Sequence, residues 1–203
     1  MDFRTMSQKQ TLLSPWRERY RVRIGFIFAL LFLWRTQPRN LVLLVLGLLI
    51  ALLGILIRQW AAGCVKKMDE LAQEGAYALV RHPLYLGSFL AASGFIFSSS
   101  SFSFALSKPY LDRTLFFWCF LWILVDSIYL PKILKEEADL HLKFNNAYTE
   151  YAERVPRFFP MKLKWSDFNF NTFNWALWKK NKEFYSLIGY LIFCVILFSR
   201  YFF

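Results

Sequence analysis

The apolar residues of this chain lie in long blocks, and its charges lie between those blocks. This pattern constrains the fold more than any other feature, because a soluble domain spreads its apolar residues periodically along helices or strands. A block of about 20 apolar residues matches the roughly 30 Å hydrocarbon core of a bilayer. Of the 203 residues, 57% are hydrophobic and 20% are aromatic. The sequence therefore predicts an all-α integral membrane protein.

Five apolar spans can be marked, and they predict about five transmembrane helices. The first is too short to cross alone, so we expect it to borrow turns from its flanks or to be partly re-entrant. It follows a basic stretch, as in a signal peptide, but no small-residue cleavage site comes after it. We therefore expect a retained first helix. The spans cover about residues 22–34, 41–59, 84–106, 114–130 and 185–203.

The distribution of basic residues predicts the orientation in the membrane. If the five spans alternate, 20 of the 25 lysines and arginines fall on one face and five on the other. Because cytoplasmic loops carry the basic excess, the amino terminus is expected in the cytosol and the carboxyl terminus outside. We expect an integral protein of a bacterial inner membrane or of the endoplasmic reticulum, with its large polar segment in the cytosol.

A net charge of +11 is compatible with a nucleic-acid partner, but the rest of the sequence argues against that function and against a metal site. No nucleic-acid-binding motif accompanies the charge, so basic loops beside anionic lipid head groups explain it better. The three cysteines have neither the spacing of a disulfide framework nor that of a metal site. A catalytic zinc needs about three protein ligands, and the chain has two histidines. We therefore expect neither nucleic acid nor metal as a partner.

A first group of functional side chains precedes the third span. It comprises Arg81, His82 and Tyr85, with Pro83 among them. Proline suits the first turn of a helix because its missing N–H would be unpaired there, and it pushes the preceding residue out of helical geometry. His82 is thus a natural cap, and the free N–H groups of the helix start beside Arg81 attract a carboxylate. The alternative is a plain helix start with a snorkelling arginine.

A second group lies in a helix that we expect to continue the fourth span into the cytosol. Glu137 and Phe144 share one helical face, and Tyr148 falls within about 20° of it if the helix runs on. Such a stripe can bind a cationic, ring-bearing cofactor through charge pairing and cation–π contact. The alternative is a solvated helix whose aromatic side chains rest on the bilayer. Asp126 precedes Glu137 by 11 residues, so both acids face one way unless Pro131 bends the helix.

Together the two groups resemble the isoprenylcysteine carboxyl methyltransferase family, which shares a broader group with phospholipid methyltransferases. The family pattern is Arg-His-Pro-x-Tyr-x-Gly, then Glu-Glu-x-x-Leu, then Phe-Gly-x-x-Tyr-x-x-Tyr-x-x-x-Val-Pro. Asn145 stands where the family usually has Gly, a mild change because Asn tolerates left-handed geometry. Ala76 stands where Pro is common. The matching residues are Arg81, His82, Pro83, Tyr85, Gly87, Glu136, Glu137, Leu140, Phe144, Tyr148, Tyr151, Val155 and Pro156.

The resemblance implies three regions in the chain. Residues 75–160 would form the methyltransferase core, with two spans and the cofactor-binding motifs. Residues 1–74 would form a basic segment and a transmembrane hairpin, and residues 161–203 an interfacial aromatic segment and the last transmembrane helix. The core would enclose a cofactor cleft at the cytosolic membrane surface, and a lipid-like or isoprenoid substrate would enter from the bilayer.

The resemblance also implies S-adenosylmethionine as the cofactor. Arg81 and Arg157 are the candidate catalytic residues, because each can hold a carboxylate of the cofactor or the substrate. We expect Arg81 on the cofactor side and Arg157 on the substrate side. The predicted cofactor contacts are Arg81, His82, Tyr85, Glu137 and Tyr148.

Two other functions stay open at this stage. A membrane reductase of the sterol-reductase type is similar in overall fold and would use NADPH, but the Glu-Glu pair and the Val-Pro-Arg ending favour a methyltransferase. A non-catalytic membrane scaffold is the other alternative, and the intact acidic and aromatic stripe argues against it. The methyl acceptor is also open: a carboxylate needs a cation beside it, whereas an amine needs a base.

Overall fold

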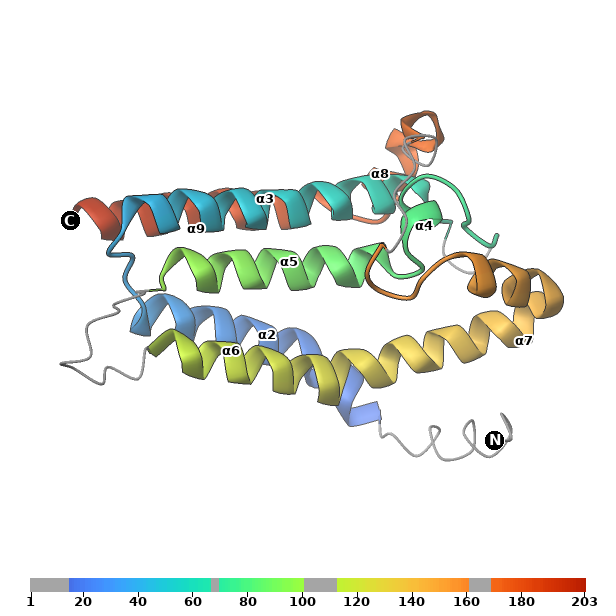
Figure 1. The fold of residues 1–203 in the computed structure, drawn as a ribbon, viewed down its shortest axis with the longest axis horizontal. Coiled ribbons are helices and arrows are strands. Elements are labelled where there is room, and N and C mark those ends of the chain that lie inside the picture. Colours follow the sequence, from blue (N-terminus) through green and yellow to red (C-terminus); the bar gives the residue numbers. More distant parts are fainter. Residues whose placement is uncertain (1–14, 67–69, 101–112, 161–168) are drawn as a thin grey trace.

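The computed structural model describes residues 15–66, 70–100, 113–160 and 169–203, and all the regular secondary structure in these ranges is helical. Figure 1 shows the long helices running side by side along one axis. The bundle consists of α2 (Pro15–Arg35), α3 (Leu41–Cys64), α5 (Pro83–Ser98), α6 (Arg113–Leu124) and α9 (Phe184–Phe202).

The remaining elements gather at one end of the bundle, opposite the carboxyl terminus (Figure 1). Helix α7 (Leu130–Arg154) continues α6 through a π-helical turn, Val125–Tyr129, and extends beyond the other helices. The short helices α4 (Ala76–Leu79) and α8 (Trp175–Lys180) lie at this end, as does a 3₁₀ turn, Phe170–Thr172.

Three of the described helices are long and apolar enough to cross a membrane. They are Leu41–Cys64, the apolar part of the continuous helix Thr114–Arg154, and Phe184–Phe202. The prediction of a helical membrane protein is confirmed at this level. The first predicted span lies in α2, which extends it by a few residues at its amino-terminal side.

The described part of the third predicted span is the shorter apolar helix Pro83–Ser98. The rest of that span, beyond residue 100, lies outside the described residues. Residues 165–168 of the predicted interfacial aromatic segment also lie outside them. The number of crossings therefore stays a prediction.

Helices α3 and α5 pack closely because glycines remove side chains from their contact. A Cβ added at Gly87 would lie 2.5 Å from the carbonyl oxygen of Gly54, and one at Gly94 would lie 2.4 Å from the backbone nitrogen of Ala51. Small residues let membrane helices approach backbone to backbone. This contact fixes α5, and hence the residues at its start, against the long α3.

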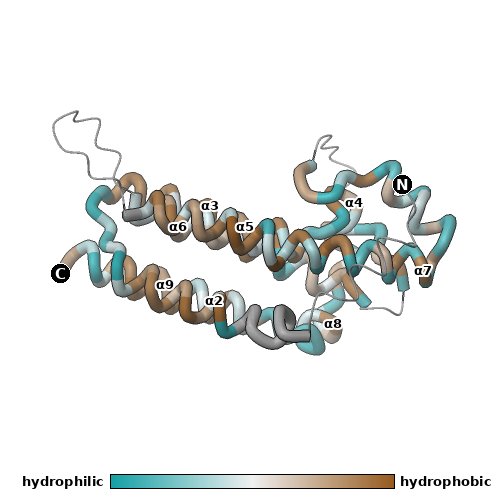
Figure 2. Tube along the Cα trace, turned by 90° about the horizontal axis from the view of Figure 1, so that it is seen from below, coloured by the Kyte–Doolittle hydropathy of each residue, from teal (hydrophilic) through white to brown (hydrophobic). Residues whose placement is uncertain are grey.

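The helices of the bundle are mostly hydrophobic along their length, and hydrophilic residues lie around α4 and α7 and in the turn at the opposite end (Figure 2). Large hydrophobic side chains are exposed along α2, α3, α6 and α9. Such a wide apolar surface suits lipid rather than water. The predicted site residues lie at the polar end that carries α4 and α7.

Candidate functional site

The site forms where the start of α5 meets α7 and the extended segment that follows α7. His82 is the N-cap of α5 and Pro83 is its first residue, as the sequence predicts. The backbone N–H of Arg81 donates to the carbonyl of Pro156 at 2.9 Å. This hydrogen bond joins the two sequence groups although they lie 75 residues apart.

The carboxylate of Glu137 is the centre of the site. Arg157 donates to both its oxygens, from Nε at 3.0 Å and from Nη2 at 2.7 Å. Arg81 Nη1 and His82 Nε2 lie 3.0 and 3.2 Å from Oε1. Four of the six predicted site residues therefore form one ion cluster.

Burial and charge act in opposite directions on this carboxylate, which lies in the polar half of α7 beyond the apolar stretch. Burial alone would raise the pKa of Glu137, but hydrogen bonds from His82 and Arg157 and the charge of Arg81 outweigh it and lower the pKa to about 2. Hydrogen bonds to the charged form stabilise that form. Glu137 is therefore ionised at any physiological pH, and its charge is already matched by two arginines.

Tyr148 joins the cluster through its hydroxyl, which accepts from Arg81 Nη1 at 3.4 Å. Tyr148 does not arrive there along a straight helix, because the backbone of α7 is non-helical at Asn145, with φ 45° and ψ −118°. Few residue types other than Gly adopt a positive φ, and Asn is among them. The positive φ fits a position where the family usually has Gly, although ψ lies outside the left-handed helical region. The sequence placed Tyr148 on the stripe only if the helix ran on, and the helix is interrupted here.

After the kink, the last turns of α7 pack beside α4. The Tyr151 hydroxyl donates to the carbonyl of Tyr77 at 2.8 Å. Tyr148, Tyr151 and Val155 form a small buried cluster. Burial raises the pKa of the Tyr77 phenol, so its hydroxyl remains a hydrogen-bond donor at neutral pH. The kink thus supplies tyrosine side chains to one side of the site.

A polar cavity of about 200 Å³ adjoins the ion cluster. Tyr85 lines the wall of this cavity but is not part of the ion cluster. The Tyr85 hydroxyl donates to Glu136 Oε2 at 3.1 Å. Neither Glu137 nor Arg157 lines the cavity. Of the residues predicted as cofactor contacts, Arg81, His82, Tyr85 and Tyr148 line it.

Several lining residues were not placed in the site by sequence reasoning, among them Glu136 and two tyrosines. Glu136, Tyr77 and Tyr151 all line the polar cavity. Helical periodicity turns Glu136 towards Leu140 and Lys143, away from the predicted stripe. Glu136 and Tyr151 could have been found from their place in the quoted motifs, whereas Tyr77 stands outside those motifs.

Asp126 and Glu137 lie in different environments, and the helix between them is not regular, which was the condition for their sharing one face. Asp126 is exposed, whereas Glu137 is buried. The π-helical turn Val125–Tyr129 lies between them, and one extra residue in a turn rotates the following helix by about 100°. Pro131 explains the turn, because it lacks an N–H and its ring displaces the carbonyl four residues before it.

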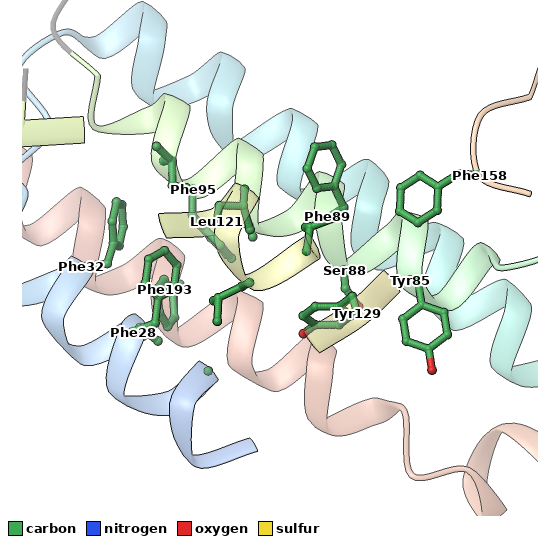
Figure 3. Close-up of a pocket in the computed structure, with 16 residues that line it drawn as sticks. Phe28, Phe32, Tyr85, Ser88, Phe89, Phe95, Leu121, Tyr129, Phe158 and Phe193 are labelled. Carbon is green, nitrogen blue, oxygen red and sulfur yellow. The ribbon is translucent and has the colours of Figure 1, made fainter. Parts of the chain in front are cut away.

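An apolar cavity of about 270 Å³ lies deeper in the bundle, next to the polar one. Figure 3 shows its lining side chains, most of which are aromatic or aliphatic. Tyr85 lines both cavities. The cavity was not expected from the sequence, because its wall combines helices far apart in the chain.

The described residues contain no group of three or more His, Cys, Asp or Glu side chains that could hold a metal ion. The polar cavity instead offers a guanidinium, an ammonium, an imidazole, two carboxylates and phenol hydroxyls. Such a set can bind an organic molecule that carries both a carboxylate and a cationic group.

The fold and the site define a helical membrane protein with a charged, tyrosine-lined site at the polar end of an apolar bundle. No family model matches the sequence, and no solved structure matches it. The nickel-cobalt-cadmium resistance protein NccN of Alcaligenes xylosoxydans xylosoxydans is 27% identical over 129 residues, which are 63% of this chain and 54% of that protein. The chain thus spans about half the length of this curated relative.

Proposed function

We propose that the protein is an S-adenosylmethionine-dependent methyltransferase that acts on a lipid-like or isoprenoid substrate at the cytosolic face of a membrane. The observation that carries the proposal is that Arg81, His82 and Glu136 line the same polar cavity. Arg81 Nε is buried and has no hydrogen-bond partner among the described residues. A buried donor without a partner is costly, and a ligand carboxylate would satisfy it.

The residues present fit the cofactor at both of its charged ends. Arg81 and His82 would hold the methionine carboxylate, and Glu136 the cationic part, with the rings of Tyr77 and Tyr148 beside it. The cofactor supplies an activated methyl group. The protein then has to orient the acceptor, exclude water and match charges.

Glu137 has a positioning role in this proposal. Its charge is matched by Arg81 and Arg157, and it holds Arg81 at the cavity wall and the segment after α7 against α5. The prediction that Glu137 contacts the cofactor directly stays open, and a comparison with Glu136 decides it. Arg157 is 43% exposed at its side chain and adjoins Phe158, which lines the apolar cavity. This position suits the substrate side.

The apolar cavity supports a lipid-like substrate. An acceptor with an apolar chain in that cavity would present its head group near Tyr85, which is shared with the polar cavity. In the proposed arrangement about five helices cross a bacterial inner membrane or the endoplasmic reticulum, and the polar end faces the cytosol. The proposed partners are the lipid substrate and the surrounding membrane lipids.

Ligand binding to the purified protein in nanodiscs tests the proposal. Calorimetry with S-adenosylmethionine is expected to show binding, followed by transfer of a labelled methyl group to a panel of prenylcysteines, phosphatidylethanolamine and small isoprenoid acids. Arg81→Ala should weaken cofactor binding. Arg154→Ala should not, because Arg154 does not line the cavity and its Nη2 instead donates to Gln73 Oε1 at 3.1 Å.

The same experiment separates the alternatives. Binding of NADPH without S-adenosylmethionine would favour a reductase of the sterol-reductase type. Binding of Ni²⁺ alone would favour a function like the one in the name of the NccN relative, which is resistance to nickel, cobalt and cadmium. No binding of any of the three would favour a scaffold.

A further inference from the structure

The apolar cavity has one continuous wall from α2. Its lining residues there are Gly25, Phe28, Ala29 and Phe32, which follow one another at positions i, i+3, i+4 and i+7. This spacing places all four on one face of the helix. The other walls come from α5, α6, the π-helical turn Val125–Tyr129 and α9, with Phe158 from the segment after α7. Helix α2 therefore forms one wall of the cavity beside the site.

Polarity changes along the cavity. Figure 3 shows Tyr85, Ser88 and Tyr129 near one end, and Phe32 and Phe193 near the other. Tyr85 also lines the polar cavity. The polar end therefore adjoins the ion cluster, and the apolar end points into the bundle. An amphiphile in the cavity would have its head group at Tyr85 and its chain directed towards Phe193.

The size of the cavity sets the size of the chain that it can hold. An engineered apolar cavity of about 150 Å³ binds benzene, which has six carbons. By the same ratio, the 270 Å³ cavity holds about ten or eleven carbons. A bilayer acyl chain fills half of a roughly 30 Å core and is longer than this.

We infer that the cavity holds the apolar chain of the methyl acceptor, that this chain has about ten carbons, and that Ala29 and Phe193 set its length. The inference rests on the proposed function and deepens it by naming the substrate class, a short-chain amphiphile. Ala29 lies in the middle of the α2 wall, where a larger side chain would enter the cavity. Phe193 stands near the apolar end, with its ring centroid 4.7 Å from that of Phe95, so its removal extends the cavity.

Photoreactive chains test the inference without relying on activity. The probes are linear carboxylic acids of 6 to 16 carbons with a terminal diazirine, given to the full-length protein in phosphatidylcholine nanodiscs. Mass spectrometry then locates the cross-links. We expect the chain of about ten carbons to label the cavity most, at residues of the apolar end such as Phe32, Ile96 and Phe193.

Two substitutions should move the preferred length in opposite directions. Ala29→Leu adds about three carbons to the wall and should reduce labelling by the ten-carbon probe about tenfold or more while sparing the shortest probe. Phe193→Ala removes a ring and should shift the optimum to longer chains. Phe193→Leu supplies a milder change if the first variant unfolds. Phe198→Ala is the matched control, since Phe198 lies on the same helix, is 37% exposed and does not line the cavity.

The results separate this inference from the proposed function. Equal labelling by a phosphatidylcholine that carries the diazirine in its acyl chain would mean that ordinary bilayer chains occupy the cavity, and it would overturn the inference. Labelling that ignores Ala29→Leu and Phe193→Ala would overturn it too. Methyl transfer with no cavity labelling would leave the proposed function standing and remove the inference. Length-selective labelling without binding of S-adenosylmethionine would support the cavity as a short-chain site and remove the methyltransferase.

Discussion

At the scale of single residues, two adjacent carboxylates lie in different environments. Glu137 is buried and bound by Arg81, His82 and Arg157, so its charge is already used within the protein. Glu136 bonds the Tyr85 hydroxyl and lines the polar cavity. The first carboxylate therefore organises the site, and the second is available to a ligand.

Replacing each glutamate by glutamine should separate the two roles. Glu137→Gln breaks a buried ionic cluster, which costs about 3–5 kcal/mol, so we expect a lower unfolding temperature in nanodiscs. Glu136→Gln should unfold near the wild-type temperature but bind S-adenosylmethionine about 10- to 150-fold more weakly, the cost of one charge-assisted contact. If Glu137→Gln keeps its stability and loses affinity, Glu137 contacts the cofactor directly.

The low pKa of Glu137 also predicts how stability depends on pH. The pKa is lowered from 4.5 to about 2, so the folded state favours the ionised form, and this contribution is complete above about pH 4.5. Stability should fall as the pH drops from about 4.5 towards 2, because protonation then favours the unfolded state. Thermal unfolding of the wild type and of Glu137→Gln should differ by a constant amount above pH 5. A difference that shrinks between pH 7 and 5 would contradict the value.

At the scale of elements, two irregular turns decide where the site residues lie. The π-helical turn Val125–Tyr129 rotates α7 relative to α6, and the kink at Asn145 turns the end of α7 towards α4. Sequence reasoning noted Asn145 as a residue that tolerates left-handed geometry where the family usually has Gly, but it did not predict the kink there. It did not predict the π turn, because Pro131 can be accommodated by a bend, a break or an extra residue.

Substitutions at Asn145 should report on the kink. Asn145→Gly is expected to be tolerated or slightly stabilising, because glycine adopts φ 45° without a side-chain penalty. Asn145→Val should destabilise by about 1–3 kcal/mol, since a β-branched residue is strained at positive φ. Thermal unfolding measures both, and cofactor binding should fall with Val because Tyr148 follows the kink. Equal stability of the two variants would mean that α7 can straighten at this point.

At the scale of the whole molecule, the sequence predicts the apolar blocks well and their arrangement poorly. Three blocks become helices of spanning length, because block length and composition depend on local sequence alone. The polar end was also predicted, since charges and motifs mark it. The apolar cavity was not, because Phe28 and Phe193 meet only through tertiary packing. Neither was the place of Glu136, which depends on the rotation of α7.

The last prediction concerns the orientation of the whole chain. The distribution of basic residues predicts that the polar end lies in the cytosol, and the structure places the carboxyl terminus at the opposite end (Figure 1). Gln37 Nε2 donates to the carbonyl of Arg200 at 3.0 Å, so the turn between α2 and α3 lies beside the end of α9. In a variant with its three cysteines replaced by serine, single cysteines at positions 37 and 203 should therefore react with a membrane-impermeant maleimide added outside, and one at position 157 should react only after the membrane is opened. Labelling of position 203 from the cytosol would require an even number of crossings. It would also contradict this orientation, because the carboxyl terminus would then lie on the same side of the membrane as the proposed site.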